Sequence, residues 1–185
     1  MDDVVDQQAI LAAALAEVIS AGIDAFSLER VAKRAGVDKS AITRIWGDRR
    51  VLLLDAQLSS SAQRVPIPDT GRLRGDLLAL VGSLVELSQT AEGRRSMHRF
   101  LAASGDADLS DVRIDFWRVR LDEMTSVLRR ADERGELRDD VDPAEAIRMF
   151  AGASLFDVVF ADVPVRQEYI TQMLDIFIRG ICKAS

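Results

Sequence analysis

Apolar residues recur along the chain at intervals of three and four, the spacing that places them on one face of an α-helix. In residues 4–21, such a face is formed by Leu11, Ala14, Leu15 and Val18. Gly22 follows as a stop signal. Between alternating apolar segments the sequence has no dipeptide typical of a β-hairpin. We therefore expect an all-α protein of about nine helices.

Two short helices are expected after the first, joined by a turn that contains Gly36. Ser27 stands where it can cap the first of the pair, and Asp38 where it can cap the second. Gly47 and Asp48 then end the pair and start a longer helix through about residue 62. The apolar faces of the pair consist of Leu28, Val31, Ala32 and Ala35, and of Ile42, Ile45 and Trp46.

Pro66 and Pro68 mark a linker over residues 64–70, because proline lacks a backbone donor and disfavours helix in the residue before it. We divide the chain there into domains 1–63 and 64–185. The second domain is expected to hold helices at about 73–90, 92–103, 110–134, 143–163 and 165–181, with a polar break at 105–108, a stop at Gly135 and a start at Asp142-Pro143.

The last two expected helices are apolar on more than one side, which calls for more than one packing partner. In the first of them, Ile147, Phe150 and Ala151 lie on one face, and Met149, Ala153 and Phe156 on another. The second partner is either a twofold-related copy of the chain or a neighbouring helix in a monomeric bundle. We favour the copy, with a dimer interface of Phe156, Val159, Phe160, Ile170, Met173, Leu174, Phe177 and Ile178.

The composition restricts the possible chemistry. The 185 residues are 48% hydrophobic and 29% charged, which is typical of a globular protein. A single cysteine, Cys182, excludes an intrachain disulfide and a cysteine-based zinc site, and His98 is the only histidine. No apolar segment is long enough for a membrane span, and the N-terminus is acidic where an export signal is basic. We expect a cytoplasmic protein that is not an enzyme and needs no cofactor.

Charge is unevenly distributed along the chain. The formal net charge is −6, yet residues 24–50 hold seven basic and four acidic side chains. Residues 51–185 hold 17 basic and 22 acidic ones. A locally positive segment on an acidic body is typical of a protein that binds a polyanion at one restricted site. Chance clustering of charges on a solvated helix surface is the alternative.

Two short helices joined by a glycine-containing turn also fit a helix-turn-helix, whose second helix enters the major groove of DNA. If the apolar faces pack against the first helix, the side chains of Lys39, Ser40, Thr43 and Arg44 point outward. Short hydroxyls and cations at a helix start suit phosphate and base contacts. Because helix-turn-helix patterns are degenerate, spacing leaves this as one interpretation among several.

Residues 10–54 resemble the DNA-binding domain of the TetR (tetracycline repressor-like) transcriptional regulators. The segment most typical of the family is Val31-Ala32-Lys33-Arg34-Ala35-Gly36-Val37; around it stand Ile10, Ala13-Ala14, Val18-Ile19, Gly22, Phe26-Ser27-Leu28, Lys39-Ser40, Ile42, Trp46, Asp48-Arg49 and Leu52. The resemblance implies a helix-turn-helix at about 27–46 within a three-helix domain, followed by a helical domain that binds a small molecule and dimerises.

The resemblance also implies roles for single residues. Ser27 would touch phosphate at the start of its helix, and Arg49 would approach the DNA backbone. Residues 39–44 would form the recognition helix, with Lys39, Ser40, Ala41, Thr43 and Arg44 at the DNA. Where this sequence has Thr43 and Ile45, family members commonly have tyrosine and an aromatic residue or histidine. These two differences affect which operator sequence the protein would recognise.

For the C-terminal half, the resemblance implies a ligand-responsive repressor that binds a palindromic operator as a homodimer and is released by a small effector. We expect a mainly apolar ligand pocket lined by Met97, Phe100, Phe116, Trp117, Met124 and Phe150. Four arginines, Arg94, Arg95, Arg118 and Arg120, could orient an acidic ligand or be solvated. The alternative to the whole interpretation is a helical ligand-binding or interaction protein without specific DNA binding.

Overall fold

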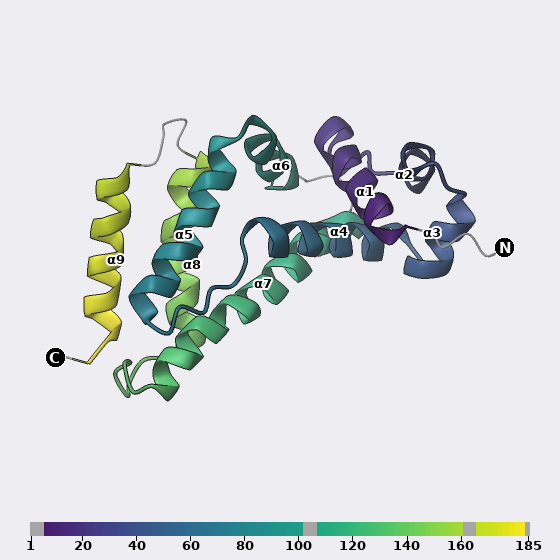
Figure 1. The fold of residues 1–185 in the computed structure, drawn as a ribbon. Helices are drawn as coiled ribbons and strands as arrows, with labels where there is room; N and C mark the ends of the chain where they lie inside the picture. Colours follow the sequence, from purple (N-terminus) through teal and green to yellow (C-terminus); the bar gives the residue numbers. More distant parts are fainter. Residues whose placement is uncertain (1–5, 102–106, 161–165, 184–185) are drawn as a thin grey trace. The chain divides into compact units, whose positions relative to one another are not determined.

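The structure is a computed structural model that describes residues 6–101, 107–160 and 166–183, without the side chains of 99, 101, 107, 108, 110 and 157–160. The described residues form nine helices (Figure 1): α1 (Gln7–Ala21), α2 (Leu28–Ala35), α3 (Lys39–Trp46), α4 (Arg49–Arg64), α5 (Leu73–Gln89), α6 (Ala91–Leu101), α7 (Ala107–Glu133), α8 (Pro143–Phe160) and α9 (Gln167–Ile181). Extended pairing within these ranges is limited to one isolated bridge, between Leu137 and Cys182. The all-α prediction is confirmed.

Most helix ends lie where the capping signals placed them. Gly22 ends α1 at a φ of 83°, and Gly47 ends α3 at a φ of 78°. Asp48 accepts hydrogen bonds from the backbone N–H groups of Arg50 (2.7 Å) and Val51 (3.1 Å), so α4 begins directly after it. In the same way Asp142 caps α8. These short polar side chains satisfy N–H groups that a helix start leaves without partners.

Three details of the predicted helix ends are wrong. Helix α1 begins at Gln7 instead of residue 4, because Asp6 accepts from the N–H groups of Gln8 and Ala9. Ser27 and Asp38 occupy the N-cap positions of α2 and α3, but neither side chain makes a capping hydrogen bond. The polar break predicted at 105–108 ends earlier than expected, because α7 already begins at Ala107. Residues 4, 5, 102–106 and 161–165 lie outside the described residues.

By packing, the chain divides into two compact units: Met1–Ser61 with Glu92–Trp117, and Ala62–Ala91 with Arg118–Ser185. The first division, after residue 61, lies close to the expected domain boundary at 63/64. Residues 92–117, which follow that boundary in sequence, pack with the N-terminal unit. Helices α4 and α7 therefore contribute residues to both units.

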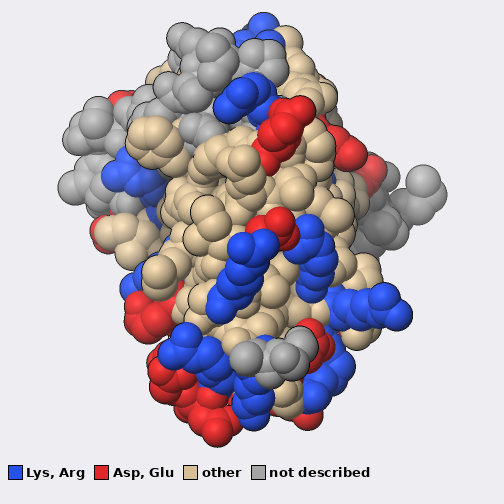
Figure 2. Space-filling view, turned by 90° about the vertical axis from the view of Figure 1, so that its left-hand side faces the viewer, with Lys and Arg blue, Asp and Glu red and all other residues tan. Residues whose placement is uncertain are grey.

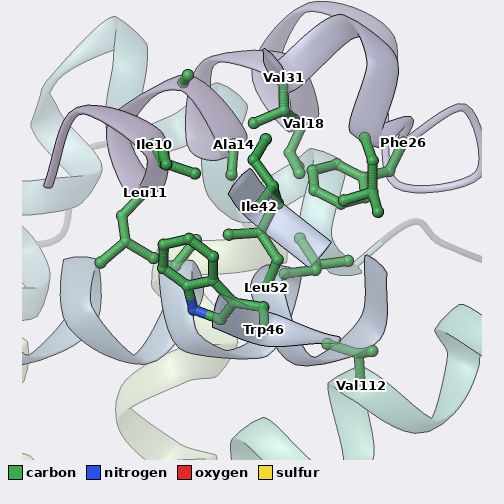
Figure 3. Close-up of a cluster of buried hydrophobic side chains, with 14 of the residues drawn as sticks. Ile10, Leu11, Ala14, Val18, Phe26, Val31, Ile42, Trp46, Leu52 and Val112 are labelled. Atoms are coloured by element: carbon green, nitrogen blue, oxygen red, sulfur yellow. The ribbon is translucent and has the colours of Figure 1, made fainter. Parts of the chain in front are cut away.

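The N-terminal unit is built around a core from α1–α4 and from the start of α7. Figure 3 shows Ile42 and Trp46 of α3 among side chains of α1, with Val31 of α2 and Leu52 of α4 nearby. Phe100, Val112 and Phe116 belong to the same cluster. Phe116 packs edge-on against Phe100 and Trp117, with ring centroids 5.0 and 5.2 Å apart.

The C-terminal unit contains α5, α8 and α9, each of which contacts the other two (Figure 1). Leu77, Ile147, Phe150 and Leu174 are among its most buried side chains. The backbone of residues 136–138 pairs with that of 181–183, which fixes the end of α9. Within the described residues, no helix is both long and apolar enough to span a membrane.

Candidate nucleic-acid interface

The second and third helices have one buried edge and one accessible edge. Val31 and Ile42 have no accessible surface, and Trp46 is 7% exposed. Gly36 takes a left-handed conformation at φ 70°, which lets the chain turn tightly from α2 into α3. On the outer edge of α3, Lys39, Ser40 and Arg44 are exposed, and Ala41 and Thr43 are half-buried. Arg49, the first residue of α4, is half-buried. The structure thus brings the predicted residues of 39–44 together on one accessible helix edge.

The end of α3 is attached to α4. The indole N–H of Trp46 donates to Oδ2 of Asp55 at 2.7 Å. Arg50, in the first turn of α4, approaches Asp111 of α7 with 3.7 Å between nitrogen and oxygen. Both contacts lie within the N-terminal unit. The orientation of α3 therefore depends on α4 through one buried aromatic side chain and one directed hydrogen bond.

Two carboxylates neutralise part of the local positive charge. Glu17 of α1 is only 2% exposed and accepts a hydrogen bond from Nε of Arg30, with Arg34 3.5 Å away. Glu29 of α2 accepts from the hydroxyl of Ser27 (2.8 Å) and the ammonium of Lys39 (2.5 Å). Glu29 is one of the four acids already counted along residues 24–50, whereas Glu17 lies outside that segment, so the buried Glu17 lowers the net positive charge at this surface below the counted excess.

The hydrogen bond from Lys39 is the main cause of a strongly lowered pKa at Glu29, about 2 against an ordinary value of 4.5. The backbone N–H of Glu29 and the hydroxyl of Ser27 lower this pKa further. Each donor favours the ionised carboxylate. At neutral pH this surface therefore presents a fully ionised acid between two residues expected at the DNA.

Thr43 has its hydroxyl turned back onto its own helix. Oγ1 donates to the carbonyl oxygens of Ser40 (3.1 Å) and Lys39 (3.3 Å). Back-bonding of this kind is common for threonine in helices. Ile45, the other departure from the family pattern, is 37% exposed beside it. To donate to a phosphate, the Thr43 hydroxyl would have to give up these back-bonds.

The expected pocket residues fall into both units. Phe100 and Phe116 are buried in the N-terminal core, with Trp117 packed against them and Met97 half-buried. In the C-terminal unit, Phe150 is 1% exposed and packs against Phe177 at 5.2 Å, and Met124 is half-buried. Four of the six residues thus lie in the N-terminal unit and two in the C-terminal unit. That they line one ligand pocket together stays a prediction.

One of the four arginines considered for an acidic ligand is not solvated. Arg120 is 3% exposed and donates to the carbonyl oxygen of Val65 (2.7 Å) and to Glu123 (2.6 Å). Its guanidinium therefore fastens the start of the linker to α7 in the C-terminal unit. In the sequence, the burial of Arg120 was indicated by its position on the face of α7 that also carries Phe116 and Val127.

The residues expected at a dimer interface differ in accessibility. Ile170 and Leu174 are buried in the core of the C-terminal unit, at 4% and 1% exposed. Met173, Phe177 and Ile178 are half-buried, and Phe156 is 63% exposed. The side chains of Val159 and Phe160 lie outside the described residues. The second apolar face of α8 is accessible, since Met149 is 72% exposed along with Ala153 and Phe156.

Two short helices that pack one edge into the core and leave the other edge of the second helix exposed have the geometry of a helix-turn-helix DNA-binding protein. Residues 10–56 match the model of the bacterial regulatory proteins of the tetR family. Residues 67–177 match the tetracyclin repressor-like C-terminal domain. The chain belongs to the TetR family of DNA-binding transcriptional regulators.

Individual relatives match between 79% and 96% of the chain. The DNA-binding transcriptional repressor TetR of Mycobacteroides abscessus is 33% identical, over 90% of this chain and 88% of the relative. The regulator AqdR of Rhodococcus erythropolis is 33% identical over 79% and 70% of the two chains. The crystal structure of the TetR family regulator SCO0332 aligns with a TM-score of 0.75 at 27% identity, covering 96% and 98%.

Proposed function

We propose that this protein is a ligand-responsive repressor that binds a palindromic operator as a homodimer and leaves it when a small, mainly apolar effector binds. It would act in the cytoplasm, where the DNA lies. One observation supports the proposed binding of DNA most directly. The edge of α3 with Lys39, Ser40 and Arg44 is exposed, while Ile42 and Trp46 hold the opposite edge in the core.

The chemistry of that edge suits duplex DNA. Arg44 can donate two hydrogen bonds to the O6 and N7 atoms of guanine, and Ser40 can bond a base edge or a phosphate. Ala41 and Ile45 can contact the methyl group of thymine. Lys39, Ser27 and Arg49 are suited to phosphates on either side. Base contacts therefore come from the middle of α3, and backbone contacts from the starts of the three helices α2–α4.

Homodimerisation is supported by an accessible apolar surface on the C-terminal unit. Met149 and Phe156 of α8 and Ile176 of α9 are 72%, 63% and 73% exposed. Figure 2 looks onto the left-hand side of Figure 1, where α9 lies: uncharged residues form a band above the middle of this face, while basic and acidic side chains stand at its centre and gather below it. Twofold pairing of such a surface would present two recognition helices to two half-sites.

Effector release would act through the spacing of those helices. Half-sites in the major groove recur about every 34–36 Å along DNA, so the two α3 helices must keep about that separation. An effector lowers DNA affinity only if it binds better to a different separation. A shift of α4 would reach α3 through Trp46 and Asp55. Repression is favoured by the M. abscessus relative, which is named a repressor.

The proposal is tested with duplex DNA and paired variants. The parent should retard random duplex at low salt, and the double variant Lys39→Ala/Arg44→Ala should not. The matched control is Arg129→Ala with Arg148→Ala, two exposed arginines of the C-terminal unit, which should bind like the parent. If the parent binds no duplex at any salt concentration, the chain acts instead as a helical interaction or ligand-binding protein.

A further inference from the structure

The Glu29 side chain bridges two groups that the proposed function assigns to DNA phosphate. Its Oε2 accepts from the hydroxyl of Ser27 at 2.8 Å, and its Oε1 from the ammonium of Lys39 at 2.5 Å. Ser27 precedes α2, and Lys39 is the first residue of α3. One carboxylate thus joins the starts of both helices of the helix-turn-helix.

The bridge has the chemistry of an anion-binding arrangement. A hydroxyl and an ammonium that share one carboxylate are the donors that a phosphate oxygen would use. Lys39 is 50% and Glu29 65% exposed, so solvent and DNA can reach both side chains. The Lys39 ammonium has two further hydrogens, but the Ser27 hydroxyl has only one, so a phosphate cannot accept from both groups in this place while Glu29 holds them. The carboxylate also repels a phosphate that approaches it.

We propose that Glu29 is an internal competitor for DNA phosphate: in the free protein its carboxylate occupies the anion site of Ser27 and Lys39, and a phosphate displaces it on binding. The inference rests on the proposed function, since it presupposes DNA at this edge. Glu29 affects DNA binding through the two donors that it holds, Lys39 and Ser27.

The competition sets a definite expectation for affinity. Exposed ion pairs are worth little, so replacing Glu29 should tighten binding by about twofold to fivefold per subunit. Because a phosphate contact reads no sequence, random and operator duplexes should gain alike. Because Lys39 contacts the phosphate in the parent complex as well, the variant gains no phosphate contact. The slope of log K against log salt should therefore stay close to that of the parent.

The experiment compares Glu29→Gln with Asp38→Asn by fluorescence anisotropy on a random duplex across a salt series. Asp38 is an exposed acid directly before Lys39, and its side chain makes no capping bond, so its variant removes the same charge and leaves the bridge intact. The expected result is a larger gain in affinity for Glu29→Gln than for Asp38→Asn, at a salt slope close to that of the parent. In a Lys39→Ala background, Glu29→Gln should lose most of its effect.

A second measurement uses the parent protein without any variant of Glu29. Because the folded pKa lies at about 2, the carboxylate should stay ionised as pH falls through 4.5 and lose its bridge only near pH 2. The side-chain carboxyl ¹³C signal of Glu29 should therefore titrate well below pH 4.5, with its midpoint near pH 2. At neutral pH, this signal should shift when duplex is added, since the carboxylate leaves its donors.

The outcomes separate the two proposals. If Glu29→Gln binds no better than the parent, or gains only as much as Asp38→Asn, the competition is absent. An unchanged carboxyl signal on DNA addition would overturn it as well. A parent that binds no duplex at all would instead contradict the proposed function itself. Circular dichroism of both variants checks that the fold is intact.

Discussion

The indole N–H of Trp46, the last residue of α3, donates to the carboxylate of Asp55 in α4 across 2.7 Å. Trp46 is at the same time part of the buried core of the N-terminal unit. Helix α3 is therefore fixed to α4 both by packing and by a hydrogen bond to a charged acceptor. A displacement of α4 cannot leave the orientation of α3 unchanged unless this bond breaks.

Replacing Trp46 with phenylalanine tests this connection. The change removes a hydrogen bond to a charged acceptor and part of a buried ring, so the free energy of unfolding should fall by about 1–3 kcal/mol. DNA affinity should fall with it, because α3 loses its fixed direction. Urea unfolding and DNA titration measure the two effects. Trp117→Phe is the matched control and should keep DNA affinity near that of the parent; equal losses in both variants would contradict the role of Trp46.

Phe150 should behave as a core residue. It is 1% exposed and packs against Phe177, so Phe150→Ala should lower the free energy of unfolding by about 3–5 kcal/mol. Its neighbour Met149 is 72% exposed, and Met149→Ala should change stability of the subunit by less than about 0.5 kcal/mol. Thermal or urea unfolding at a fixed protein concentration compares them. A small effect at Phe150 would indicate that its ring borders an open pocket instead.

Phe156 should contribute to subunit association. Burying its ring between subunits would gain about 1.5–3 kcal/mol, so Phe156→Glu should raise the dimer dissociation constant at least tenfold. Sedimentation velocity across a concentration series reports the change. Leu78→Glu alters another exposed apolar residue of the C-terminal unit, 43% exposed on α5, and should leave association unchanged. If Leu78→Glu dissociates the dimer and Phe156→Glu does not, the interface lies elsewhere.

Substitutions of Arg44 and of Arg49 should affect DNA binding in different ways. Arg44→Ala should cost about 1–3 kcal/mol on the operator and relax base preference at one position, because a bidentate base contact is lost. Arg49→Ala should weaken binding equally for all sequences and flatten the salt dependence by about 0.9 per subunit. Titrations of operator and random duplex at several salt concentrations distinguish the two. Equal behaviour of the two variants would contradict the division into base and backbone contacts.

Helix positions were predictable wherever the signal was local. Gly22, Gly47 and Asp142 act within one turn of the chain, and the helices end or begin beside them as expected. Ser27 shows where this reasoning fails. Its hydroxyl oxygen could have accepted from a backbone N–H at the start of α2, but the side chain donates to the Glu29 carboxylate and makes no capping bond. The two bonds use different parts of the hydroxyl, so the spacing of residues alone does not decide which of them forms.

Contacts between distant parts of the chain could not be predicted. Glu29 and Lys39 are ten residues apart in different helices, and Glu17 pairs with Arg30 from the preceding helix. A carboxylate on an otherwise apolar face of residues 4–21 was the one signal that Glu17 would be buried. For the candidate site, sequence reasoning placed the recognition edge but missed the acids that neutralise part of its charge.

Selection of bound duplexes from a random pool, with the parent protein at micromolar concentration, tests the central claim most directly. We expect an enriched sequence with two inverted half-sites, whose centres are separated by about one or two turns of DNA. Variants without Lys39 and Arg44 should enrich nothing above background. An enriched sequence without inverted symmetry, or no enrichment by a protein shown to be folded, would contradict a twofold dimer that reads DNA through α3.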